Sequence, residues 1–113
     1  MHEASLAQSL VDIVVRHAQQ AGSSNVKTVH VDVGALAQVL PAALETAFFA
    51  ASRGTVAQDA VLKMHTVAGH AWCMACSQTS EVADRLASCP LCGSGQLMVT
   101  GGDVLKVREL EVD

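Results

Sequence analysis

The sequence predicts an α/β (α+β) two-layer fold, in which two helices pack on a small mixed three-stranded sheet and a subdomain is inserted before the last strand. Three observations predict this fold. Two segments have apolar residues at helical spacing, and three others have the alternation or β-branched composition of strands. All four cysteines lie between the second and third of these strands. With 113 residues, the chain can form one core and a small appendage.

The first helix is predicted over residues 5–20, where apolar side chains recur at spacings of three and four. Ser5 is placed to cap its start, and Gly22 with the polar residues after it ends it. The positions that follow this amphipathic spacing are Leu6, Leu10, Ile13, Val14 and His17.

A strand over residues 26–33 follows, because its side chains alternate strictly between the two faces. Val29, Val31 and Val33 form the buried face, and Thr28, His30 and Asp32 form the other.

The second helix is predicted over residues 42–52, with Pro41 in its first turn, where the missing N–H costs nothing. Its core positions are expected to be Leu44, Phe48 and Phe49, and it ends before Gly54. Further strands are predicted over residues 61–67 and 104–112, the last one after the turn 101–103. The sequence does not indicate the order of the strands.

Composition excludes several classes of protein. Hydrophobic residues make up 50% of the chain and charged residues 16%, which is not the composition of a disordered chain. A net charge of −4 and an aromatic content of 3% disfavour nucleic-acid binding. We expect no membrane span, because no apolar run is long enough, and no signal peptide, so the predicted location is cytoplasmic.

The strongest motif is a pair of C-x-x-C turns, Cys73–Cys76 and Cys89–Cys92, separated by twelve residues. Four thiolates in this pattern can close a tetrahedral zinc site, and Gly93 supplies the backbone freedom that such turns need. Because residues 69–95 show little apolar periodicity, we expect a metal to replace a hydrophobic core there, in a zinc-ribbon-like subdomain. Iron or an iron–sulfur centre and a redox dithiol are the alternatives.

The amino terminus offers a second candidate metal site. A free amine at Met1, the imidazole of His2 and nearby backbone nitrogens, including that of Glu3, could surround one Ni(II) or Cu(II) ion. In an arbitrary protein the same residues would be a solvated, frayed end.

The chain resembles the HypA family of hydrogenase maturation nickel chaperones. The resemblance covers nearly the whole chain and rests on the start Met1-His2-Glu3, the two cysteine motifs and several short segments. These segments are Ser5-Leu6, Val33-Gly34-Ala35-Leu36, Arg53-Gly54-Thr55, Trp72 before the first cysteine, and residues 101–112 with Gly101-Gly102 and Glu109-Leu110-Glu111-Val112.

The resemblance implies a nickel metallochaperone with a nickel-binding α/β domain at residues 1–68 and 101–113 and an inserted zinc domain at residues 69–100. It implies that His2, with backbone nitrogens at Met1, His2 and Glu3, binds transferable Ni(II), and that structural Zn(II) is held by Cys73, Cys76, Cys89 and Cys92. The implied partners are a HypB-type GTPase and the large subunit of a nickel–iron hydrogenase. Urease is another possible recipient, and a homodimer is possible. Leu40 stands where family members often have an acidic residue.

Other features predict no enzyme, because no catalytic triad, phosphate loop or close carboxylate pair is found. We expect the remaining histidines, His17, His30, His65 and His70, to be surface or edge residues, with His70 the nearest to the cysteine motifs. Two rival functions remain. One is a zinc-ribbon protein-interaction adaptor without transferable metal, and the other is a redox protein.

Overall fold

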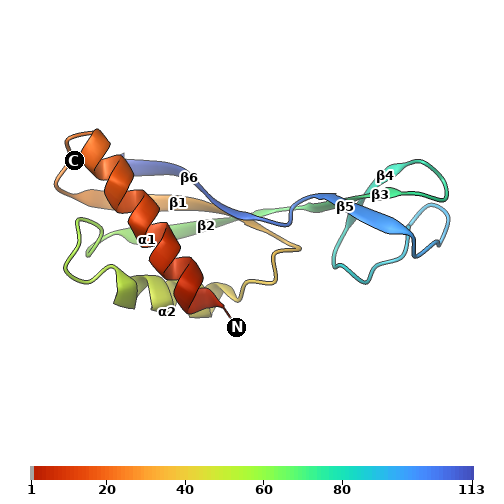
Figure 1. The fold of residues 1–113 in the computed structure, drawn as a ribbon, viewed down its shortest axis with the longest axis horizontal. Helices are drawn as coiled ribbons and strands as arrows, with labels where there is room; N and C mark the ends of the chain where they lie inside the picture. Colours follow the sequence, from red (N-terminus) through yellow and green to blue (C-terminus); the bar gives the residue numbers. More distant parts are fainter. Residues whose placement is uncertain (1) are drawn as a thin grey trace. The chain divides into compact units, whose positions relative to one another are not determined.

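The structure is a computed structural model that describes residues 2–113. Within them it contains two helices and six strands arranged in two three-stranded sheets, ordered β2-β1-β6 and β4-β3-β5 (Figure 1). The elements are α1 (Glu3–Gln20), β1 (Val26–Gly34), α2 (Pro41–Ala51), β2 (Val61–Val67), β3 (Gly69–Cys73), β4 (Thr79–Val82), β5 (Leu97–Gly101) and β6 (Leu105–Val112). Two helices with a small mixed sheet and a second, cysteine-bearing sheet confirm the predicted fold class.

The chain divides into two compact units. The first contains the chain up to Val31 together with Val39–His65 and Lys106–Asp113, and the second contains Asp32–Gln38 and Thr66–Leu105. Residues 32–38 belong to the unit that carries the cysteines. The reason is Leu36, which packs against Ala71 and Val82 of that unit.

In the first unit both helices lie on one face of the β2-β1-β6 sheet (Figure 1). Hydrogen bonds from Asp113 N–H to Asn25 O and from Gly34 N–H to Val104 O show that β6 runs antiparallel to β1. The predicted alternation of β1 is confirmed, because Val29 and Val31 are fully buried while His30 and Asp32 are only partly so. The core on the α1 side consists of Ala7, Leu10, Val11, Val14 and Ala18.

The start of α1 differs from the prediction. The helix begins at Glu3 with His2 at the N-cap, so the expected cap at Ser5 is wrong. The Ser5 hydroxyl instead donates to the carbonyl oxygen of His2, at 3.0 Å, inside the first turn. The helix therefore begins two residues earlier than predicted, and the N-cap residue His2 is exposed.

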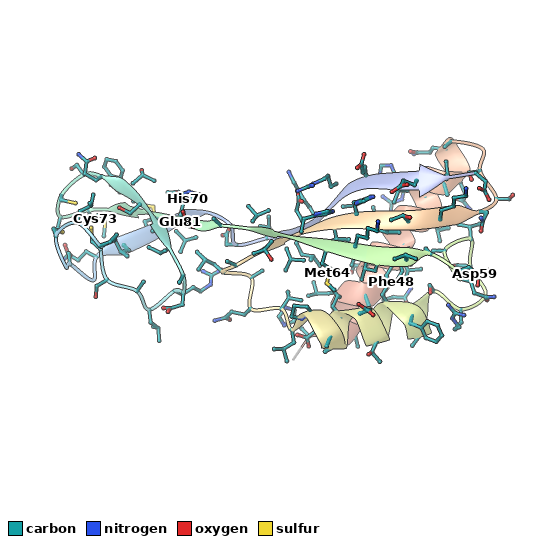
Figure 2. The ribbon with its side chains drawn as sticks, turned by 180° about the vertical axis from the view of Figure 1, so that it is seen from behind. Phe48, Asp59, Met64, His70, Cys73 and Glu81 are labelled. Carbon is teal, nitrogen blue, oxygen red and sulfur yellow. The ribbon has the colours of Figure 1, made fainter. Side chains whose placement is uncertain are left out.

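The second helix begins at Pro41, as the sequence predicts, with Leu40 at the N-cap. Leu44 and Phe48 are buried, and Figure 2 shows Phe48 on the side of α2 that faces the sheet. The prediction that Phe49 joins the core is wrong, because its side chain is 63% exposed. Consecutive helical residues lie 100° apart, so one residue of a Phe-Phe pair can be buried while the next faces solvent.

The second unit is built on the antiparallel sheet β4-β3-β5, in which Trp72 lies opposite Thr79 on one side and Met98 on the other. The sequence predicts no strands in this segment and no hydrophobic core of its own. The structure corrects both points, because Leu36, Ala71 and Val82 are buried together, with Leu97 and Val99 packed against them. This core is small, and one of its three members comes from the distant segment 32–38.

Neither of the two helices found in residues 2–113 has the length and apolarity needed to cross a membrane.

Candidate metal centre

The structure brings the four cysteines together. The Sγ atoms of Cys73 and Cys92 are 3.6 Å apart, those of Cys76 and Cys89 are 3.7 Å apart, and all four lie within 4.8 Å of one another. Cys73 ends β3, as Figure 2 shows, and Cys76 lies in the turn that follows it. Cys89 and Cys92 come from the loop before β5. Strand β3 thus fixes one pair, and the loop returning to β5 carries the other.

The two cysteine turns have the same backbone hydrogen bonds. In the first turn, Ser77 N–H donates to Cys73 O at 2.9 Å and Cys73 N–H donates to Gln78 O at 2.9 Å. In the second turn, Gly93 N–H donates to Cys89 O at 2.8 Å and Cys89 N–H donates to the carbonyl of residue 94 at 2.7 Å.

Each turn closes on a residue in the left-handed region, with φ of +59° at Ser77 and +80° at Gly93. The sequence predicted this role for Gly93. It did not reveal it for Ser77, because serine is not a marker of positive φ.

Backbone N–H groups point at the sulfur atoms inside these turns. The N–H of Leu91 lies 3.4 Å from Cys89 Sγ. Hydrogen bonds from the Cys76 and Ala75 N–H groups lower the pKa of the Cys73 thiol to about 7, although burial opposes this shift. Burial and hydrogen bonds with the neighbouring sulfurs raise the pKa of Cys76 to about 12. The four thiolates therefore need a cation among them to be ionised together.

The donor set fits a soft or borderline dication. Four sulfurs at ~2.3 Å from a tetrahedral zinc ion would lie ~3.8 Å from each other, and two of the sulfur pairs are 3.6 and 3.7 Å apart. Four protein ligands leave no open coordination position, which is typical of structural rather than catalytic zinc. The geometry by itself also fits iron. A paired redox dithiol is not favoured, because all four sulfurs converge on one point.

The predicted nickel site lies at the start of α1. Met1 is outside the described residues, so only His2 and Glu3 can be placed. His2 is exposed, and its carbonyl accepts the first helical hydrogen bond, from Leu6 N–H at 3.0 Å. Glu3 is only 7% exposed, and its Oε2 accepts a hydrogen bond from Leu40 N–H at 3.1 Å. This bond ties the start of α1 to the start of α2.

Leu40 stands at the N-cap of α2, where the resemblance stated above implies an acidic residue. Its own side chain is 63% exposed and offers no ligand atom, but its N–H is the group that holds the Glu3 carboxylate. An acidic group is nevertheless present at the start of α2, because the carboxylate of Glu3 reaches it from α1.

The other histidines are distributed between the two units. His17 is exposed on α1, and His70 is exposed on β3 in register with Glu81, close to which Figure 2 shows it. The expectation of a surface or edge residue holds for His65, which lies on the edge strand β2, and is wrong for His30, which lies on the central strand β1. These two partly buried side chains are hydrogen-bonded to each other at 3.0 Å, and His30 also contacts Glu111. Their pairing depends on the order β2-β1-β6, which the sequence did not indicate.

Comparison with protein families gives one match over nearly the whole chain. Residues 1–112 match the family described as hydrogenase/urease nickel incorporation, metallochaperone, HypA. Hydrogenase maturation factor HypA of Rhodopseudomonas palustris strain BisA53 is 47% identical over 113 residues, covering 100% of both chains. The protein of the same name from Rhizobium leguminosarum bv. viciae is 43% identical over 112 residues, covering 99% of both.

The fold is also similar to a solved structure. The solution structure of the nickel metallochaperone HypA from Helicobacter pylori superposes with a TM-score of 0.74, at 24% sequence identity. The match covers 99% of this chain and 97% of the other. At this identity the likeness supports the fold, and the family comparison supports the relationship.

Proposed function

The chain belongs to the HypA family of hydrogenase maturation nickel metallochaperones, and on this premise we propose that it binds Ni(II) at its amino terminus and delivers the ion with a HypB-type GTPase. The recipient is the large subunit of a nickel–iron hydrogenase, and delivery takes place in the cytoplasm. Such a transfer is ligand exchange between proteins and needs no covalent catalysis.

The observation that carries this proposal is the position of His2. Its side chain is exposed at the first turn of α1, in a chain whose start Met1-His2-Glu3 belongs to the family resemblance. The imidazole, the terminal amine and the backbone nitrogens of His2 and Glu3 form an all-nitrogen donor set. Such a set suits Ni(II) in a square-planar arrangement.

Glu3 has a positioning role in this proposal. Its carboxylate is engaged by Leu40 N–H and is largely buried, so Glu3 contributes its backbone nitrogen to nickel while its side chain anchors the segment. Because the segment is already anchored, its ligand atoms lose less conformational entropy when they bind the ion.

We further propose that Cys73, Cys76, Cys89 and Cys92 hold a structural Zn(II). The convergence of four sulfurs supports this assignment, as does the small size of the core beside them. When bound, zinc supplies the cross-link that a core of three buried side chains cannot supply alone.

The test is native mass spectrometry with a nickel titration on protein that carries an authentic, untagged amino terminus. We expect one zinc and one nickel per chain in the wild type, and zinc alone in His2→Ala. His17→Ala is the matched control, because His17 is also an exposed histidine on α1, and this variant should bind both metals. Nickel binding that persists in His2→Ala would refute the amino-terminal site. Zinc without nickel in the wild type would favour an adaptor.

A further inference from the structure

The edge strand β6 has an ordered distribution of charge. In the described chain it pairs with β1 on one side and with no strand on the other, and Figure 1 shows it on the far side of β1 from β2. An edge strand presents N–H and C=O groups that can pair with another chain, and scattered charges usually prevent this. The charges of β6 are instead sorted, with the basic residues first and the acidic ones last. They are Lys106 and Arg108, followed by Glu109, Glu111 and the adjoining Asp113.

The backbone of β6 has groups that point to its free side. The carbonyl of Val104, just before the strand, accepts a hydrogen bond from the end of β1, and the N–H of Asp113, just after it, donates to the turn before β1. Backbone groups of successive strand residues point to alternate sides. Counted from either end, those of Val107 and Leu110 therefore point away from β1.

The side chains of β6 are divided between the two faces of the sheet. Val107 and Leu110 are half-buried, whereas Lys106 and Glu111 beside them are exposed. Glu111 lies on the face opposite the helices, because it contacts His30, whose neighbours in β1 are buried. By the alternation of a strand, Lys106 lies on this open face too, and the two apolar side chains lie on the helix side.

This pattern is complementary to itself. When two copies of β6 run antiparallel about a two-fold axis at the middle of the strand, every contact occurs twice. Apolar then meets apolar on the helix side, and basic meets acidic on the open face, which are favourable cross-strand pairs. A parallel arrangement would set like charges opposite each other. The antiparallel pairs are Val107 with Leu110, Lys106 with Glu111, and Arg108 with Glu109 of the second copy.

Charged groups for these pairs are available. Within residues 2–113, no hydrogen bond or ion pair engages the amine of Lys106 or the carboxylate of Glu109. Glu111 contacts His30 through Oε2, which leaves Oε1 for a lysine of the second copy. Pairing of Lys106 with Glu111 therefore adds to the contacts inside one chain and does not replace them.

The other edge strand of the same sheet lacks this complementarity. Strand β2 contains no acidic residue. Turned on itself about Met64, it would set Lys63 opposite His65 of a second copy, so no pair of opposite charges forms. The charge pattern therefore favours β6 over β2 as a self-pairing edge.

We propose that a second copy of this chain docks on β6, so that the two β2-β1-β6 sheets become continuous across a two-fold axis. The interaction uses the same surface on both copies, so it closes on itself and gives a dimer rather than a fibre. This inference does not depend on nickel binding.

The experiment measures self-association of the full-length, metal-loaded protein by sedimentation equilibrium, from about 1 µM to about 1 mM and at two salt concentrations. We expect a monomer–dimer equilibrium with a dissociation constant in this range, because the interface is only one strand wide. Dimerisation should weaken with salt, because the ion pairs lie on an exposed face. A chain that stays monomeric over the whole range would overturn the proposal.

Two charge reversals test the pairing itself. Lys106→Glu sets two glutamates opposite each other and Glu111→Lys sets two lysines opposite each other, so each should raise the dissociation constant about tenfold or more. In an equimolar mixture each reversed residue meets an opposite charge, and a heterodimer should form with nearly wild-type affinity. Lys63→Glu is the matched control on β2 and should change the affinity less than twofold. A mixture no more dimeric than either variant alone would refute the pairing.

Val107→Pro tests the main-chain pairing. Proline removes an N–H that points to the free side, so the bonds to β1 stay intact while a bond to the second copy is lost. The variant should keep its circular dichroism spectrum and lose the dimer. In the wild type, amide exchange at Val107 and Leu110 should slow as the protein concentration rises. Concentration-dependent protection in β2 or in the second unit instead would overturn the assigned surface.

Discussion

His30 and His65 are hydrogen-bonded to each other across the neighbouring strands β1 and β2. The Nδ1 atom of His30 is 3.0 Å from Nε2 of His65, the ring planes differ by 16°, and the ring centres are 5.2 Å apart. On the other side of His30, Nε2 lies 2.5 Å from Oε2 of Glu111. A single chain of side chains thus crosses β2, β1 and β6.

The tautomers of this pair follow from the carboxylate. An ionised Glu111 can only accept, so Nε2 of His30 must carry the hydrogen, and Nδ1 of neutral His30 accepts from Nε2–H of His65. We expect ¹⁵N spectra of the neutral imidazoles to show both rings protonated at Nε2. The side chain of Gln in Glu111→Gln can also donate a hydrogen bond. In this variant the preference of His30 for the tautomer protonated at Nε2 should therefore weaken. A wild-type His30 protonated at Nδ1 would contradict this arrangement.

The same contact predicts a pH dependence of stability. The hydrogen bond from His30 lowers the pKa of Glu111 below its ordinary value of 4.5. A carboxylate with a depressed folded-state pKa stabilises the fold above its ordinary pKa, and this contribution disappears as the pH falls through the folded value. Chemical denaturation should therefore give the wild type a slightly higher free energy of unfolding than Glu111→Gln at pH 6. This difference should disappear well below pH 4.5. An equal difference at both pH values would show that the contact is not electrostatic.

The two cysteine turns offer a matched pair of substitutions. Ser77 adopts φ of +59°, which is unfavourable for a residue with a Cβ, so Ser77→Gly should stabilise the second unit by about 1 kcal/mol. Gly93 adopts φ of +80° and an added Cβ would meet nothing within 4 Å, so Gly93→Ala should cost about 1 kcal/mol through backbone strain alone. Zinc retention against a competing chelator should follow the same order. Equal retention in both variants would contradict it.

Removal of the metal should affect the two units differently. The first unit has its own core, formed by α1, α2 and the β2-β1-β6 sheet, whereas the core cluster of the second consists of Leu36, Ala71 and Val82. After treatment with a chelator, amide exchange should become fast at Ala71 and Val82 and stay slow at Val29 and Val31. Cys76→Ser should reproduce this pattern. Uniform loss of protection in both units would mean that the metal stabilises the whole chain.

The Gly101-Gly102 pair should tolerate substitution at only one position. Gly102 has φ of +71°, and a Cβ there would lie 2.2 Å from the carbonyl oxygen of Ala68. Gly102→Ala should therefore destabilise the protein by about 3 kcal/mol, because both the strain and the backbone clash oppose it. At Gly101 an added Cβ would meet nothing within 4 Å, so Gly101→Ala serves as the control in thermal denaturation. Similar melting temperatures for the two variants would contradict the close approach.

Local patterns in the sequence were sufficient to predict the helices and strands of the first unit. The valines of β1 alternate, Pro41 marks the start of α2, and the three- and four-residue spacing predicts the helix α1. Of the positions chosen by that spacing, Leu10 and Val14 are buried, Leu6 and Ile13 are half-buried and His17 is exposed. These signals depend on residues close together in the chain. The same holds for the two C-x-x-C motifs, whose spacing requires that the sulfurs of each pair lie near one another.

Contacts between distant segments were decided only by the tertiary structure. Leu36 joins the core of the second unit, Leu40 N–H holds the Glu3 carboxylate, and His30 meets His65 only because β1 lies next to β2. Even the burial of Phe48 and exposure of Phe49 depend on which face of α2 meets the sheet. Periodicity identifies a face and an element type, but strand order and long-range packing are set by the free energy of the whole core.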